Sequence, residues 1–107
     1  MSDALDKLFA TIASRKSGDP NASYTAKLLA AGVETCAKKF GEEATETVIA
    51  AIQKDKAELA KESADVLYHL LVLWAASGIT PHDVYAVLQS REGQSGLEEK
   101  EIGRAHV

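Results

Sequence analysis

Two short acidic pairs are the residues of this sequence best suited to chemistry. Glu43 and Glu46 form the first pair, and Glu62 and Asp65 form the second, each with two residues between the acids. Positions three apart lie about 60° apart around a helix axis, so each pair presents both carboxylates on one face. Carboxylates this close repel one another and raise each other's pKa unless a cation neutralises them. Because Mg²⁺ takes oxygen ligands and keeps bound water, the pattern predicts a Mg²⁺ site between two helices.

A fifth acid, Glu42, lies four residues before Glu46 and therefore falls in the same arc. The simplest alternative is that these acids form a solvated helix face, because charge runs usually face water. Lys38 and Lys39 stand four residues before Glu42 and Glu43, as surface ion pairs would. The first acidic pair alone does not separate a metal site from such a surface.

The second acidic pair favours the metal site. Glu62, Asp65 and His69 share one face of a predicted helix. The apolar residues beside or around this face are Leu59, Val66, Leu70 and Leu73. Acids that border a core are costly when they are isolated, and a shared metal ion removes that cost.

A di-iron carboxylate bundle is the second alternative. Such a site needs Glu-x-x-His on two helices. Here His69 lies four residues after Asp65, and the helix that carries Glu43 has no histidine. Iron is therefore not expected, and His69 is expected to be a core or pocket histidine that supports the site at most.

Length and composition describe one small domain. The chain has 107 residues, of which 46% are hydrophobic and 26% charged, as in ordinary soluble proteins. The net charge of -4 leaves no basic stripe for nucleic acid. The single Cys36 excludes an internal disulfide, no signal peptide is recognisable, and the longest apolar run (70–76) is too short for a membrane span. We expect a cytoplasmic protein.

Helical periodicity, caps and breakers predict an all-α bundle of four to five helices, built around the third and fourth. The predicted helices cover 3–16, a short segment between the cap Ser23 and Gly32, 33–52, a segment from the cap Asp55 to about 77, and one from the cap Thr80 to about 91. Ser2 is the expected cap of the first helix, and Asp55 with Glu58 three residues later has the spacing of a capping box. The apolar side of the third helix is predicted to be Cys36, Phe40, Ala44, Val48 and Ala51. Gly41 in this helix costs stability, so a ligand or another backbone is expected to approach it closely.

The fourth helix is apolar almost all round from Val66 to Ala76. A helix that is apolar on every side must be covered on every side. One small chain has little material for this, so the sequence predicts a homo-oligomer, most simply a dimer, with Trp74 losing exposure to solvent on assembly.

Taken together, the motifs resemble a known family. Glu-x-x-Glu, a spacer of fifteen residues and Glu-x-x-Asp resemble the metal signature of the all-α nucleoside triphosphate pyrophosphohydrolases, the MazG-like superfamily. Within it, four further stretches are similar to the phosphoribosyl-ATP pyrophosphohydrolases of histidine biosynthesis. These stretches are 23–28 (SYTAKL), 38–44 (KKFGEEA), 65–73 (DVLYHLLVL) and 95–100 (SGLEEK). The resemblance covers residues 4 to 100.

The resemblance implies a dimeric enzyme that depends on Mg²⁺, with Mn²⁺ as a substitute. It implies hydrolysis of phosphoribosyl-ATP between the α and β phosphates, giving phosphoribosyl-AMP and pyrophosphate. The implied metal ligands are Glu43, Glu46, Glu62 and Asp65. Glu42 is implied as a further ligand or as the base that orients water, which makes Glu42 and Glu43 the catalytic pair. The implied substrate contacts are Ser23, Thr25, Lys27 and Lys39.

Two alternatives to this function stay open. The first is a house-cleaning pyrophosphatase for nucleoside triphosphates on the same fold, and the second is a non-catalytic helical interaction module. Residues 1–100 are expected to form the single domain. Residues 101–107 depart from the family pattern, and codons for them contain the start of a common sequencing adapter, so this tail is expected to be disordered or artefactual. His106 is therefore assigned to no site.

Overall fold

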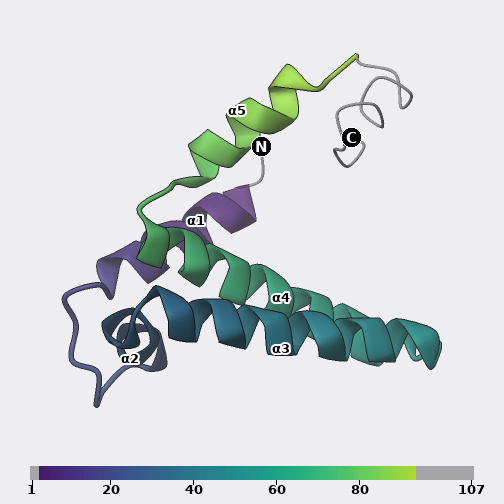
Figure 1. Ribbon diagram of the computed structural model, residues 1–107, viewed down its shortest axis with the longest axis horizontal. Helices are drawn as coiled ribbons and strands as arrows, with labels where there is room; N and C mark the ends of the chain where they lie inside the picture. The colour runs from purple at the N-terminus through teal and green to yellow at the C-terminus, as the bar shows by residue number, and fades with distance from the viewer. Residues whose placement is uncertain (1–2, 94–107) are drawn as a thin grey trace.

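The computed structural model describes residues 3–93, and within this range the chain is all-α (Figure 1). The helices are α1 (Asp3–Ser14), α2 (Tyr24–Ala31), α3 (Val33–Ile52), α4 (Lys56–Ser77) and α5 (Pro81–Ser90). The predicted fold class is confirmed. The predicted tail 101–107 and the motif 95–100 lie outside the described residues, as does Ser2, the expected cap of the first helix.

The helix ends fall where local signals placed them. Ser23 Oγ accepts a hydrogen bond from the Ala26 N–H at 3.1 Å and so begins α2. Asp55 caps α4 by accepting from the Glu58 N–H at 3.0 Å. Gly78 ends α4 with φ +80°, a left-handed conformation that favours glycine. Only α1 differs noticeably, because it ends two residues before the predicted position.

A complete capping box occurs at α5 rather than at α4. The Asp83 N–H donates to Thr80 Oγ1 at 3.3 Å, and the Thr80 N–H donates to Asp83 Oδ2 at 2.8 Å. At α4 the spacing of Asp55 and Glu58 predicted the same motif. There the Asp55 N–H donates to the Ala50 carbonyl at 3.3 Å, so only one half of the box forms.

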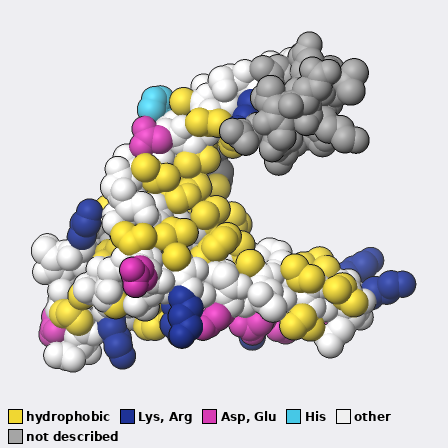
Figure 2. Space-filling view, viewed as in Figure 1, with side chains coloured by type: hydrophobic (Ala, Val, Ile, Leu, Met, Phe, Trp, Pro, Cys, Tyr) yellow, Lys and Arg dark blue, Asp and Glu magenta, His cyan; other side chains and the backbone are white. Residues whose placement is uncertain are grey.

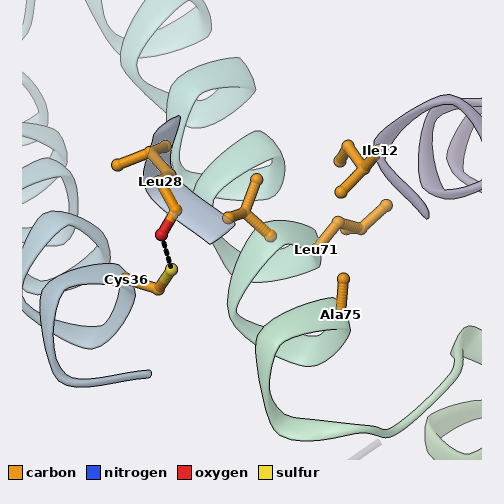
Figure 3. Packing of buried hydrophobic residues seen from close by; sticks show 6 residues of the cluster. Ile12, Leu28, Cys36, Leu71 and Ala75 are labelled. Atoms are coloured by element: carbon orange, nitrogen blue, oxygen red, sulfur yellow. Dashed lines mark hydrogen bonds between the residues drawn. The ribbon is translucent and has the colours of Figure 1, made fainter. Parts of the chain in front are cut away.

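The core lies where α1 and α2 pack against the second half of α4, beside the start of α3 (Figures 1 and 3). Its fully buried side chains include Ile12, Leu71 and Val72. The Cys36 thiol donates to the Leu28 carbonyl at 3.3 Å, which joins α3 to α2 (Figure 3). This core fixes the antiparallel pair of α3 and α4 that carries the acids.

The other half of the α3–α4 pair projects as an arm away from α1, α2 and α5 (Figures 1 and 2). Val48 is 57% exposed and Ile52 is 74% exposed. Val48 and Ala51, placed on the apolar side of the third helix by the sequence, are thus exposed, because no other described helix covers this end of the pair. The radius of gyration of 15.7 Å exceeds the roughly 13 Å of a compact domain of 100 residues.

The apolar segment Val66–Ala76 is covered within the chain more fully than predicted. Leu71 and Val72 have no exposed surface, because α1 and α2 pack on this part of α4. Leu67, nearer the arm, stays 42% exposed. Leu70, Leu73 and Trp74 are half-buried, so this segment keeps some apolar exposure outside the arm as well.

Gly41 does not lie against any other part of the described chain. A Cβ placed there would meet no atom within 4 Å. The expected close approach of another backbone of this chain is wrong. The approach of a ligand stays a prediction.

No single helix among residues 3–93 is long and apolar enough to cross a membrane. The helices α4 and α5 meet such a criterion only when taken together, as a pair bent by 105°.

Candidate active site

Three of the five predicted acids converge where α3 and α4 pack side by side. Glu43 comes from α3, and Glu62 and Asp65 come from α4. Each contributes a carboxylate oxygen, and these oxygens all lie within 4.8 Å of one another. An octahedral Mg²⁺ lies about 2.1 Å from its ligands, so two ligand oxygens are up to about 4.2 Å apart. The spacing of the three acids is thus close to that of ligands of one hard cation.

A threonine hydroxyl joins the two helices at the acids. Thr47 Oγ1 donates to the Glu43 carbonyl at 2.8 Å and also lies 3.3 Å from the Glu62 carbonyl. The first contact is the usual helical bond to the residue four positions earlier. The second crosses to α4 and sets the register of one acidic pair against the other. Sequence reasoning missed Thr47, although its place one turn after Glu43 was a signal.

Two of the acids, Glu43 and Glu62, have pKa values raised above those of isolated carboxyls. A hydrogen bond to the Glu46 carboxyl, together with burial and the charges of Glu46, Asp65 and Glu42, raises the pKa of Glu43. The Oε2 atom of Glu43 is buried and has no hydrogen-bond partner among the described residues. A buried carboxylate oxygen without a partner is costly, so this atom needs a proton or a cation.

Glu62 is the most perturbed of these acids. Burial, followed by the charge of Glu46, raises the pKa of Glu62 to about 7. Contacts with the carboxyl groups of Asp65 and Glu58 act in the same direction. A buried carboxyl whose pKa lies near neutral pH beside other acids has the electrostatics of a cation site.

Glu46 and Glu58 lie at the edge of the group. Glu46 is exposed, and it lines a cleft of about 280 Å³ together with Glu58 and Glu62. Sequence reasoning treated Glu58 only as part of a helix cap. Its position four residues before Glu62 was the signal that it shares the acidic face.

Glu42 lies outside the three converging acids. It is 47% exposed and pairs with Lys39, whose Nζ lies 3.5 Å from Glu42 Oε1. Exposed pairs of this kind contribute little to stability. The solvated-face alternative therefore describes Glu42 and Lys39, but it does not describe Glu43, Glu62 and Asp65.

His69 is buried beside the acids, as predicted for a pocket histidine. It is 7% exposed and meets the rings of Tyr68 and Tyr24 edge-on, with centroids 5.0 and 6.4 Å away. Burial lowers the pKa of His69, and the charge of Asp65 opposes this shift. A neutral imidazole here separates the acids from the first turn of α2.

The remaining predicted substrate contacts lie on or just before α2. The Ser23 hydroxyl caps the helix, and the Thr25 hydroxyl hydrogen-bonds the Tyr68 hydroxyl on α4. Lys27 is exposed and lines a second cleft, of about 380 Å³, together with Ser23 and Tyr24. Ser23 and Thr25 thus have structural partners, whereas Lys27 faces solvent.

Comparison with known proteins decides the family. Residues 5–92 match the model of the phosphoribosyl-ATP pyrophosphohydrolase family. The chain belongs to this family. It is 62% identical over 96 residues to a phosphoribosyl-ATP pyrophosphatase of Parvibaculum lavamentivorans, and this match covers 90% of this chain and 88% of that protein. It is 58% identical over 99 residues to a phosphoribosyl-ATP pyrophosphatase of Paramagnetospirillum magneticum, and this match covers 92% of this chain and 91% of that protein.

Membership of the phosphoribosyl-ATP pyrophosphohydrolase family confirms the resemblance seen in the sequence. The chain is a hydrolase of this family, and its acidic group can hold a metal ion. The hard carboxylate oxygens, the buried Glu43 oxygen without a partner and the raised pKa of Glu62 all suit a divalent cation.

Proposed function

We propose that this protein hydrolyses phosphoribosyl-ATP between its α and β phosphates, giving phosphoribosyl-AMP and pyrophosphate in histidine biosynthesis. The observation that carries the proposal is the convergence of Glu43, Glu62 and Asp65 within 4.8 Å in a chain of this family. An acidic protein can bind a polyphosphate only if cations are present at the site. The acidic group supplies the place for one.

Mg²⁺ is the proposed ion, with Mn²⁺ as a substitute. Glu43, Glu62 and Asp65 would hold it, and Glu46 would complete the ligand set from the edge of the cleft. When bound, the ion neutralises phosphate charge and makes coordinated water more acidic. The raised pKa of Glu62 supports this assignment, because cation binding offers the compensation that a shared proton otherwise provides.

Glu42 and Lys39 are proposed to act at the exposed rim. Lys39 is proposed to pair with a substrate phosphate, since 41% of its side chain is exposed and its Nζ lies 3.5 Å from Glu42 Oε1, one residue before Glu43. Glu42, exposed and paired with Lys39, is suited to accept a proton from the attacking water. The water oxygen forms a bond to phosphorus while the bond to the bridging oxygen breaks and pyrophosphate leaves. Positioning and charge stabilisation carry most of such a reaction.

The test is a pyrophosphate-release assay with phosphoribosyl-ATP and a panel of nucleoside triphosphates, each with Mg²⁺, with Mn²⁺ and with excess chelator. We expect phosphoribosyl-ATP to be the preferred substrate, turnover to stop in chelator and either ion to restore it. Preference for a nucleoside triphosphate would indicate the house-cleaning alternative. No turnover of any substrate would indicate an interaction module, and full turnover in chelator would exclude the metal.

A further inference from the structure

The cleft at the start of α2 has no role in the metal site described above. Its volume is about 380 Å³, somewhat larger than that of the cleft beside the acids. The residues that line it are Pro20, Asn21, Ala22, Ser23, Tyr24 and Lys27. It thus combines an aromatic ring, a cation and several small polar groups, which is a lining suited to a phosphorylated sugar or nucleoside.

The cleft lies within reach of the acids along α4. The Tyr24 ring meets the buried His69 ring edge-on, with centroids 6.4 Å apart and planes at 89°. His69 follows Asp65 by one helical turn, which corresponds to a rise of roughly 6 Å. The Tyr24–His69 separation and this rise together are comparable to the distance from the phosphates to the base of a nucleotide. A nucleotide with its phosphates at the acids is therefore long enough to bring its base to Tyr24.

The first turn of α2 is held in place against α4. The Thr25 hydroxyl hydrogen-bonds the Tyr68 hydroxyl, and the Tyr68 ring packs edge-on against His69 with centroids 5.0 Å apart. Tyr24 remains 55% exposed although its ring packs against that of His69. An exposed ring in a fixed place is a stacking surface that loses little freedom when a ligand binds.

Charge decides which part of the substrate belongs in this cleft. Phosphoribosyl-ATP carries a triphosphate at one end and the monophosphate of the phosphoribosyl group at the other. The acids can receive the triphosphate only through a cation, whereas the monophosphate needs a positive side chain. Lys27 is the basic residue in the lining of the α2 cleft. Within residues 3–93, no carboxylate lies within 4.0 Å of its ammonium group.

We propose that the α2 cleft binds the phosphoribosyl end of the substrate, with Lys27 pairing with the 5-phosphate and Tyr24 packing against the adjoining ring. These two residues then distinguish phosphoribosyl-ATP from ATP, which lacks that group. The proposal rests on the proposed function for the identity of the ligand, and it makes Lys27 and Tyr24 determinants of specificity.

The test measures binding rather than turnover. Calorimetric titration compares phosphoribosyl-AMP with AMP on the wild type, Lys27→Met, Lys27→Arg and the control Lys38→Met, whose exposed lysine lies on α3 away from the cleft lining. We expect the wild type to prefer phosphoribosyl-AMP. Lys27→Met should lower its affinity for phosphoribosyl-AMP by about tenfold or more, as charged hydrogen bonds do. It should lower the affinity for AMP far less, while Lys27→Arg and Lys38→Met keep the preference.

The role of Tyr24 is tested with two substitutions, one of which keeps the aromatic ring. Tyr24→Phe should bind phosphoribosyl-AMP like the wild type, and Tyr24→Leu should lose about tenfold, a typical effect of removing an aromatic stacking partner. Equal losses for phosphoribosyl-AMP and AMP in Lys27→Met, or no loss for either, would overturn the assignment of the cleft.

The turnover assay keeps the two proposals apart. If the wild type hydrolyses phosphoribosyl-ATP but the Lys27→Met variant still prefers phosphoribosyl-AMP to AMP, only the assignment of the cleft is contradicted. A wild type that does not hydrolyse phosphoribosyl-ATP contradicts the proposed function, and the affinity ratio of phosphoribosyl-AMP to AMP still decides whether the cleft binds the phosphoribosyl group.

Discussion

The acids of this site alter one another's protonation, so they behave as a group rather than as independent residues. Glu43 owes its raised pKa first to a shared hydrogen bond with Glu46, and Glu62 owes its raised pKa first to burial. Both causes penalise the fully ionised group. A divalent cation removes the penalty, so the same arrangement that is unfavourable without metal is selective for metal.

Neutral replacements of the acids should separate activity from stability. Glu43→Gln, Glu46→Gln, Glu62→Gln and Asp65→Asn are each expected to lower kcat/KM by about a hundredfold or more, because ligand loss removes charge stabilisation worth several kcal/mol. In excess chelator each should melt no lower than the wild type, since one repulsive charge is gone.

The matched control for this series is Glu34→Gln, an exposed acid in the first turn of α3, nine residues before Glu43. It should keep wild-type kinetics. Near-normal rates in two or more of the four site variants would show that the acids are a solvated face.

The pKa of Glu62 predicts how the metal-free protein responds to pH. Its folded-state pKa, about 7, lies above the reference value of 4.5, so the folded state binds the extra proton between these values. Stability from this group is complete below about pH 4.5 and is lost as pH rises to 7 and beyond. The melting temperature in chelator should therefore fall more steeply from pH 5 to pH 8 in the wild type than in Glu62→Gln. Parallel curves would contradict the raised pKa.

At the scale of elements, local signals predicted the helices well and cross-helix contacts poorly. Ser23, Asp55 and Thr80 each cap the helix they were expected to cap, because a cap depends on only three or four neighbouring residues. The contact of Thr47 with the Glu62 carbonyl and the place of Glu58 in the cleft depend on how α3 and α4 pack. One-dimensional spacing identifies a helix face, but not what that face meets.

The bridge between α3 and α4 can be tested with two threonines of one helix. Thr47→Val removes a hydroxyl that contacts both the Glu43 and Glu62 carbonyls, whereas Thr45→Val removes one that bonds only to Gly41 within α3. We expect Thr47→Val to lower the free energy of unfolding by about 1 kcal/mol and to raise the Mg²⁺ concentration that gives half-maximal activity. Urea unfolding and Mg²⁺ titrations measure these two quantities, and Thr45→Val should change neither of them appreciably. Equal effects of the two substitutions would show that the contact with α4 contributes neither to stability nor to metal binding.

At the scale of the whole molecule, hydrophobic side chains gather on the inner face of the molecule as well as on the arm (Figure 2). The sequence shows that α4 is apolar nearly all round, but not which half of it the chain covers. Leu71 is fully buried by α1 and α2, and Trp74 packs against the same cluster. A charged residue at position 71 should therefore unfold the chain rather than merely separate subunits. Trp74 is only half-buried, so its loss of exposure on assembly stays a prediction.

The exposed apolar residues of the arm predict a homodimer in which a second copy covers the α3–α4 pair. Val48, Ile49, Ile52 and Leu67 are between 42% and 74% exposed, and burying a side chain of this kind is worth roughly 1.5–3 kcal/mol. Val48→Lys and Leu67→Lys should each raise the dimer dissociation constant about tenfold or more. Val87→Lys on α5, which replaces an equally exposed apolar residue, should leave the dissociation constant as it is. Sedimentation from nanomolar to micromolar concentration measures all four proteins, and a wild type that is monomeric and fully active throughout would exclude the dimer. We expect the wild type to sediment as a dimer at micromolar concentration, because an exposed group of apolar side chains commonly marks a protein–protein interface.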